Sequence, residues 1–179
     1  MEAIRLDMDG LTVEQLERIA RQKAPVELTP AAEERIAAAR RLVDDWVAAE
    51  RTVYGVTTGF GALSDVTISG RDARRLQVNI LRSHAAGVGE NLNSECVRAM
   101  MALRIKDLAR GHSGIRLETV HHLVTLLNRD VCPLVPEKGS VGASGDLIPL
   151  AHMALVLIGE GEAVVSGRRM SGREALADQ

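Results

Sequence analysis

The sequence predicts a mainly α-helical protein, and three observations support this fold class. Apolar residues recur at helical spacing over several long segments, which is typical of amphipathic helices. Thr12 and the pair Thr29–Pro30 precede two of these segments, and threonine caps and first-turn prolines mark helix starts. Glycines separate the segments, as turn residues do between helices. A chain of 179 residues, 46% of them hydrophobic, can bury a core as a single domain.

The helices can be placed in chain order from these signals. Thr12 with Gln15 forms the pattern of a capping box, so the first helix begins there. A second helix is expected from Thr29–Pro30 to about Glu50. Its predicted apolar face consists of Ile36, Ala39, Leu42, Val43 and Trp46. The later predicted helices cover residues 71–86, 94–109, 117–128 and 146–158, and another starts within residues 172–179.

Between the helices, glycine and proline predict loops and extended chain. Residues 54–61 contain three glycines, which excludes a helix. Pro133 and Pro136 favour extended backbone. Residues 162–170 are expected to form a β-hairpin that turns at Ser166–Gly167.

Composition excludes several classes of function. Lys and Arg number 22 against 24 Asp and Glu, so the chain lacks the basic excess of a nucleic-acid binder. Cys96 and Cys132 fit neither a disulfide framework nor a zinc pattern, and we expect no metal. No signal peptide is visible, and the longest apolar stretch, residues 147–158, is too short to cross a bilayer. We therefore expect a cytoplasmic protein without membrane or nucleic-acid partners.

The most unusual segment is the glycine-rich run at residues 138–146, KGSVGASGD. A glycine-rich loop before a helix can bind an anion on its backbone N–H groups. The alternative is a tight helix start with Asp146 in the first turn. The segment matches neither a Walker A loop nor a dinucleotide-binding fingerprint.

Together with Leu147 and residues 149–152 (PLAH), this run resembles the signature of the aromatic amino acid ammonia-lyases and aminomutases. The resemblance implies that Ala143–Ser144–Gly145 cyclises to the electrophile 4-methylideneimidazole-5-one (MIO). The Gly145 nitrogen would attack the Ala143 carbonyl carbon, and Ser144 would lose its hydroxyl as water. Glycine suits this step because it leaves the nitrogen unhindered and the backbone free. Gly142 and Asp146 are implied to support the loop.

Residues 54–61, YGVTTGFG, resemble the tyrosine loop that lies over the electrophile in this family. The resemblance implies that Tyr54 is a general acid or base and that Gly61 supports the loop. A base role requires a phenol pKa below its ordinary value of about 10. The alternative is a packed tyrosine whose hydroxyl is satisfied elsewhere.

A third match covers residues 76–89, in which Ser83–His84 occupies the position that helps to read the substrate side chain. A Ser-His pair there resembles histidine ammonia-lyases, although some tyrosine aminomutases keep it. His84 can donate to or accept from an imidazole or a phenol. The alternative is a histidine that caps its helix near Gly87. His152 is expected to be a buried, hydrogen-bonded helix residue near the electrophile loop.

The resemblance implies the N-terminal helical domain of the fumarase/aspartase-like ammonia-lyase fold. It covers about the first third of a family member, so residues 1–179 would form one MIO-bearing domain without the C-terminal helical bundle. Full-length members are homotetramers. We therefore expect a fragment that is inactive alone and in which MIO need not have formed.

The implied reaction is elimination of ammonia from a small amino acid, L-histidine, to give trans-urocanate. A tyrosine ammonia-lyase or tyrosine 2,3-aminomutase is the nearest alternative. A non-catalytic truncated subunit is another, and an anion-binding module is a third.

Overall fold

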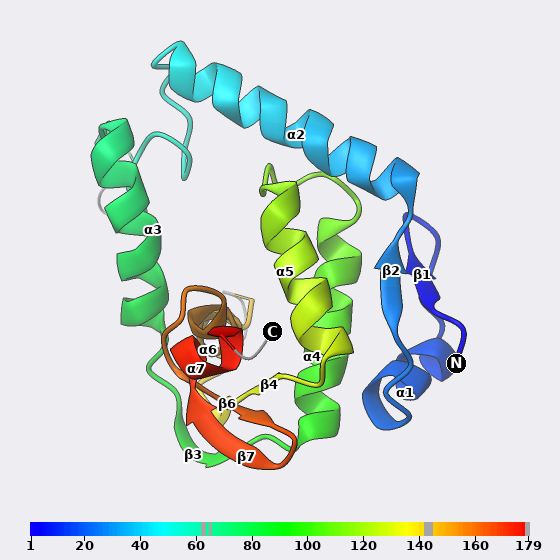
Figure 1. Ribbon diagram of the computed structural model, residues 1–179. Helices are drawn as coiled ribbons and strands as arrows, with labels where there is room; N and C mark the ends of the chain where they lie inside the picture. The colour runs from blue at the N-terminus through cyan, green and yellow to red at the C-terminus, as the bar shows by residue number, and fades with distance from the viewer. Residues whose placement is uncertain (62–63, 65, 142–144, 178–179) are drawn as a thin grey trace.

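The computed structural model describes residues 1–61, 64, 66–141 and 145–177, which form a mainly helical fold as predicted (Figure 1). The helices are α1 (Val13–Arg21), α2 (Pro30–Ala48), α3 (Gly70–His84), α4 (Ser94–Leu108), α5 (Leu117–Asn128), α6 (Leu147–Leu157) and α7 (Gly172–Ala177). The strands are β1 (Ile4–Leu6), β2 (Val26–Leu28), β3 (Val88–Asn91), β4 (Cys132–Pro133), β5 (Pro136–Lys138), β6 (Glu162–Val165) and β7 (Arg168–Ser171).

The helices pack as two groups. One contains α1, α2, α4 and α5, the other contains α3, α6 and α7, and they meet where α5 contacts α6. Helices α4 and α5 lie side by side, and α1 packs against α4. Helix α2 crosses above α5, while α3 stands apart from α4 and contacts α6 near its own C-terminal end (Figure 1). The core lies mainly between α1, α4, α5 and β2, where the fully buried side chains include Ile19, Val26, Met101, Ile105 and Leu126.

Local capping explains why the predicted helix starts are confirmed. The Thr12 hydroxyl accepts from the Gln15 amide at 3.2 Å, and the Gln15 side chain accepts from the Thr12 amide at 3.0 Å. The Thr29 hydroxyl accepts from the Ala32 amide at 3.1 Å, with Pro30 in the first turn of α2. Both arrangements satisfy N–H groups that have no partner inside the helix. The predicted hairpin is also confirmed, since β6 and β7 pair antiparallel around Ser166 and Gly167.

Three strand pairs were not predicted. Strands β1 and β2 pair parallel, β3 pairs antiparallel with β5, and β4 pairs antiparallel with β6. Strands of two to four residues carry too little alternation to be recognised, and their partners are distant in sequence. The apolar face predicted for α2 is buried unevenly. Ile36 is buried, Val43 and Trp46 are half-buried, and Leu42 is 55% exposed.

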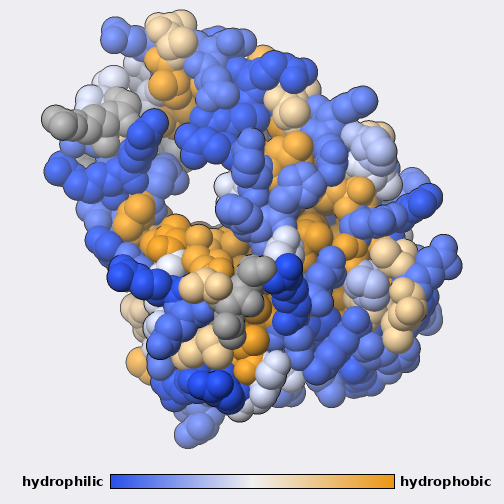
Figure 2. Space-filling model, viewed as in Figure 1, coloured by the Kyte–Doolittle hydropathy of each residue, from blue (hydrophilic) through white to orange (hydrophobic). Residues whose placement is uncertain are grey.

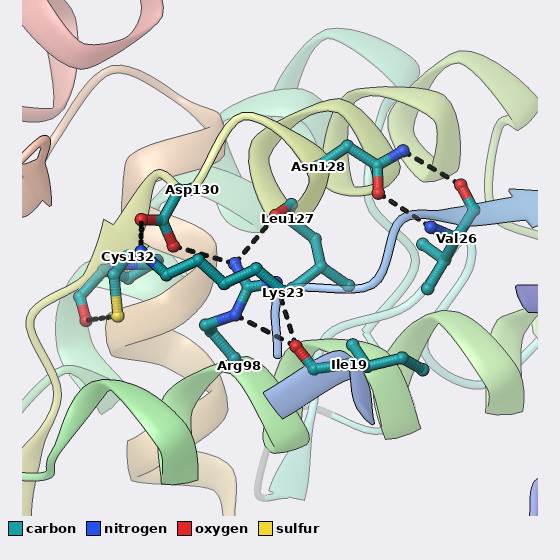
Figure 3. A network of polar contacts seen from close by, with 9 residues as sticks. Ile19, Lys23, Val26, Arg98, Leu127, Asn128, Asp130 and Cys132 are labelled. Carbon is teal, nitrogen blue, oxygen red and sulfur yellow. Dashed lines mark hydrogen bonds and ion pairs between the residues drawn. The ribbon is translucent and has the colours of Figure 1, made fainter. Parts of the chain in front are cut away.

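Two cations are buried in α4, which sequence analysis did not anticipate. Arg98 donates from Nε and Nη2 to the Ile19 carbonyl, at 3.2 and 3.0 Å. Its Nη1 donates to the Leu127 carbonyl and to Asp130 Oδ1, each at 2.9 Å (Figure 3). Arg98 thus links the ends of α1 and α5, whose last carbonyls lack intrahelical donors. The second cation, Lys106, donates to the carbonyls of Asp7 and Met8.

Cys132 lies beside this network (Figure 3). Burial, with a further contribution from the Asp130 charge, raises the pKa of its thiol to about 11. It is therefore a protonated thiol at neutral pH and packs as a small buried residue.

Gly172 provides the first test of the packing. A Cβ at this position would lie 2.1 Å from the carbonyl oxygen of Glu160, which belongs to the backbone and cannot rotate away. Gly172→Ala is expected to lower the free energy of unfolding by about 1–3 kcal/mol, the usual cost of overpacking. Gly10→Ala is the matched control, because no atom lies within 4 Å of the place where its Cβ would stand. Equal urea midpoints for the two variants would contradict the packing of α7 against Glu160.

Candidate active site

The electrophile segment is the glycine-rich stretch of residues 139–146, which is predicted to carry MIO. It connects β5 to α6. Gly142, Ala143 and Ser144 lie outside the described residues. Gly145 has φ +77°, a conformation that favours glycine, and nothing lies within 4 Å of the place where a Cβ would stand. Asp146 follows with φ +52° as the N-cap of α6. Two successive left-handed residues make the sharp turn by which the chain enters α6.

Asp146 does not cap α6 with its side chain. Its carboxylate instead accepts a hydrogen bond from the Ser140 hydroxyl. This bond joins the two ends of the electrophile segment. Sequence analysis did not identify Ser140. The available signal was a serine within a glycine-rich run, because serine hydroxyls commonly form hydrogen bonds that stabilise turns.

Ser83 and His84, which are predicted to recognise the substrate side chain, lie in the last turn of α3. Ser83 is exposed, and its hydroxyl donates to the Ile80 carbonyl at 3.1 Å. His84 is half-buried, with Nδ1 2.9 Å from the same carbonyl and 3.1 Å from the Ser83 hydroxyl. A carbonyl can only accept, so Nδ1 carries the proton in that bond and Nε2 of a neutral ring is an acceptor. The ring is therefore held against its own helix. This geometry also fits the alternative interpretation, in which His84 caps the end of α3.

Strand pairing brings the end of α3 to the electrophile segment. Val88 of β3 pairs with Lys138 of β5, which leads directly into Gly139. A Cβ on Gly139 would lie 2.5 Å from Ile148 Cγ2 and 3.4 Å from the Cα of Gly87. Segments far apart in the sequence thus meet at the start of α6.

Two side-chain contacts reinforce this meeting of α3 and α6. His152 of α6 accepts a hydrogen bond from the Gly87 amide on Nε2 at 3.0 Å, and burial lowers the pKa of this histidine. His152 is half-buried and hydrogen-bonded, as expected in part. At the outer edge, Arg82 Nε donates to both carboxylate oxygens of Glu160, at 2.9 and 3.1 Å. The Arg82 guanidinium lowers the pKa of Glu160 through these bonds.

The tyrosine loop is held by its threonines, which sequence analysis passed over. The Thr57 hydroxyl accepts from the Val53 amide at 2.8 Å and donates to the Arg51 carbonyl at 2.6 Å. The Thr58 hydroxyl accepts from the Gly55 amide at 3.1 Å. Such bonds are how threonine stabilises tight turns.

Tyr54 lies on the surface of this loop. Its ring is 64% exposed and meets Phe60 edge to face, with centroids 5.9 Å apart. Gly61 follows with φ +55°, which favours glycine. In the described part of the chain, no hydrogen bond or ring contact joins Tyr54 to His84, Gly145 or Asp146. The structure therefore brings the end of α3 to the start of α6, whereas the ring contact given for Tyr54 is with Phe60 of its own loop.

The candidate segments present apolar side chains to the surface. Exposed large hydrophobic residues at these segments are Tyr54, Phe60, Val88, Val141 and Leu147. Figure 2 shows an opening between the regions of α3 and α5, with hydrophobic atoms along its lower edge. Across the residues that are described, no helix is long and apolar enough to cross a membrane. The same residues contain no group of three His, Cys, Asp or Glu side chains that could hold a metal ion.

Comparison with known proteins agrees with the motifs. The family described as aromatic amino acid lyase matches residues 11–179. Histidine ammonia-lyase of Caldanaerobacter subterraneus subsp. tengcongensis is 51% identical over 98% of this chain, which covers 35% of that protein. Histidine ammonia-lyase of Symbiobacterium thermophilum is 55% identical over 98% of the chain, which covers 34% of it. The chain thus spans about a third of the length of these relatives.

Solved structures confirm the fold class. Histidine ammonia-lyase from Trypanosoma cruzi has a TM-score of 0.92 at 39% identity, covering 99% of this chain and 34% of that one. A tyrosine aminomutase from Streptomyces globisporus has a TM-score of 0.92 at 34% identity, with 99% and 33% covered. With nearly all of its residues matched by the family, this chain belongs to the aromatic amino acid lyases.

Proposed function

We propose that this chain is the N-terminal part of an enzyme that eliminates ammonia from L-histidine to give trans-urocanate. The observation that carries the proposal is the 51–55% identity to histidine ammonia-lyases, with Ser83–His84 placed where the end of α3 meets the start of α6. Residues 1–179 would act as a single N-terminal domain. The proposed location is the cytoplasm and the proposed assembly a homotetramer.

The proposed prosthetic group is MIO, formed from Ala143–Ser144–Gly145. The left-handed backbone at Gly145, a conformation that glycine adopts without strain, fits a ring closure through its nitrogen. In that closure the Gly145 nitrogen bonds to the Ala143 carbonyl carbon, whose oxygen leaves as one water. Ser144 loses its hydroxyl and α-hydrogen as a second water. When present, the group supplies an electrophile that binds the substrate amine and makes ammonia a better leaving group.

The described residues have distinct proposed roles around this segment. The bond from Ser140 to Asp146 would hold the loop closed, while Gly142 would allow its bend. The Nε2 atom of His84 would accept a hydrogen bond from the substrate imidazole. Tyr54 would remove the β-proton of the substrate as a general base. Because the chain spans about a third of its relatives, we propose that it turns over little substrate alone.

A tyrosine ammonia-lyase or tyrosine 2,3-aminomutase is the second candidate. The observation that favours it is the TM-score of 0.92 to a tyrosine aminomutase. His84 could equally accept from a phenol hydroxyl. A non-catalytic subunit is the third candidate, and it predicts binding to a full-length relative without product formation.

The first test is the intact mass of the purified 179-residue chain. A deficit of two water molecules, localised to the peptide that contains Ala143–Gly145, is expected when the loop reaches the geometry of ring closure. An unmodified mass in the chain alone, followed by the deficit after addition of the C-terminal part of the Symbiobacterium thermophilum relative, would support dependence on that part. No deficit in either state would contradict the proposed group.

The second test measures turnover of the complemented chain with L-histidine and L-tyrosine. The control is the relative divided at the same position, which shows whether two separate parts can assemble. We expect urocanate from L-histidine and no product from L-tyrosine. Turnover of L-tyrosine alone would favour the second candidate, and no turnover beside an active control would favour the third.

A further inference from the structure

We propose that His152 is a positioning residue, which holds the end of α3 at a fixed place beside the start of α6 through its hydrogen bond with Gly87. This inference rests on the proposed function, because the end of α3 would read the substrate side chain and the start of α6 would carry the electrophile. His152 itself would touch neither substrate nor electrophile. It would act through the backbone that follows His84.

The contact is close and lies between the two elements. The Gly87 amide donates to His152 Nε2 at 3.0 Å. A Cβ on Gly87 would lie 3.0 Å from the same nitrogen and 3.1 Å from Pro136 Cβ. The backbone at Gly87 therefore passes directly against the histidine ring on one side and β5 on the other. A side chain at this position would require the histidine ring or Pro136 to shift by a few tenths of an ångström, so glycine suits the close approach.

The bond to His152 is one of a series of hydrogen bonds that hold the successive backbone residues from the end of α3 to the start of β3. The amide of Ala85 still donates to Leu81 within the helix, at 3.0 Å, and the amide of Ala86 donates to His84 at 2.8 Å. Gly87 then donates to His152, and Val88 pairs with Lys138. Without His152, the Gly87 amide would lose this hydrogen bond at the step where the chain leaves α3.

The acceptor role defines the state of the ring. Nε2 can accept from an amide only when it carries no proton, so the neutral ring holds its proton on Nδ1. Partial burial favours this neutral form, in the same direction as its lowered pKa. A second link, between Arg82 of α3 and Glu160 in the turn after α6, lies at the surface, where ion pairs hold a geometry weakly. His152 is therefore the inner and better-shielded link.

Two substitutions separate the hydrogen bond from the shape of the side chain. His152→Phe keeps a planar ring but has no acceptor. His152→Gln places an amide oxygen at about the reach of Nε2, so it retains an acceptor. His122→Phe is the matched control, because His122 is exposed on α5.

The first measurement is amide hydrogen exchange of Gly87 in the 179-residue chain. We expect exchange to be about fivefold or more faster in His152→Phe, as loss of one hydrogen bond predicts, and close to the original rate in His152→Gln. Identical rates in the original chain and in His152→Phe would overturn the proposal. This measurement requires no turnover, so it decides the hydrogen bond even when the proposed function fails.

The second measurement is the kinetics of the complemented enzyme with L-histidine. We expect KM to rise about fivefold in His152→Phe, because the residues at the end of α3 would bind the substrate side chain less tightly. We expect kcat to stay within about twofold of the original, because the reacting groups are retained. His152→Gln should restore KM. The two-water mass deficit should be unchanged in both variants.

A purely structural role predicts a different pattern. Partial unfolding would reduce the amount of active enzyme, which lowers kcat and leaves KM unchanged. That result in His152→Phe, or an equal rise of KM in His122→Phe, would overturn the proposal. If the original complemented chain does not turn over L-histidine while the divided relative does, the proposed function fails, and Gly87 exchange alone then judges the hydrogen bond.

Discussion

Replacing Ser144 with alanine is expected to lower turnover of L-histidine by the complemented enzyme at least about a thousandfold. Alanine has no hydroxyl to lose, so the methylidene carbon of the proposed electrophile cannot form. Enzymes supply rate accelerations of about 10⁶-fold or more, and loss of the reacting group removes a large part of this. The measurement is the initial rate of urocanate formation, together with the intact mass of the variant.

The mass separates loss of the electrophile from loss of the fold. Ser144→Ala should never show the two-water deficit, because the second water comes from the serine hydroxyl. Ser113→Ala is the matched control, since Ser113 is exposed and accepts only a long hydrogen bond of 3.3 Å from Ile115. It should keep both the deficit and the rate. Full turnover in Ser144→Ala would refute the proposed origin of the electrophile.

The helices were predictable because their signals are local. The capping box at Thr12 and the cap at Thr29 act within three residues, so sequence spacing alone reveals them. The hairpin of β6 and β7 is equally local, since its two strands are joined by Ser166 and Gly167. Such contacts depend little on how the rest of the chain folds.

The remaining contacts depend on distant partners. The pairing of β1 with β2 joins residues 22 apart, and Arg98 reaches Ile19 over 79 residues. An arginine in a helix is ordinarily solvated, so nothing in the local sequence indicates that Arg98 is buried. The uneven burial of the apolar face of α2 could not be predicted for the same reason, because periodicity shows that a face is apolar but not what covers it.

The candidate site contains both features that local sequence predicts and features that depend on distant contacts. Its segments could be identified from the sequence because each carries a distinctive run of residues around Tyr54, Ser83–His84 and Gly145–Asp146. How they meet could not, because the pairing of Val88 with Lys138 and the bond from Gly87 to His152 are set by packing. The role of Tyr54 in the site remains a prediction.

Replacing Arg98 with methionine is expected to lower the free energy of unfolding by about 2–6 kcal/mol, since two buried carbonyls lose their donor at a cost of about 1–3 kcal/mol each. Methionine fills similar space but donates no hydrogen bond. The carbonyls of Ile19 and Leu127 would lose their donor at the ends of α1 and α5, and Asp130 would lose its buried partner. The measurement is urea unfolding of the 179-residue chain, followed by circular dichroism.

Lys23→Met is the matched control, because Lys23 pairs with the same Asp130 at 2.6 Å but is 62% exposed. Exposed pairs contribute about 0–1 kcal/mol, so this variant should unfold close to the original midpoint. Equal losses in the two variants would mean that the charge of Asp130 governs stability and that the two carbonyls contribute little. A much larger loss in Arg98→Met would instead assign the stability to the joining of α1, α4 and α5. Since none of these helices carries a candidate site residue, folded Arg98→Met should still show the mass deficit wherever the original chain does.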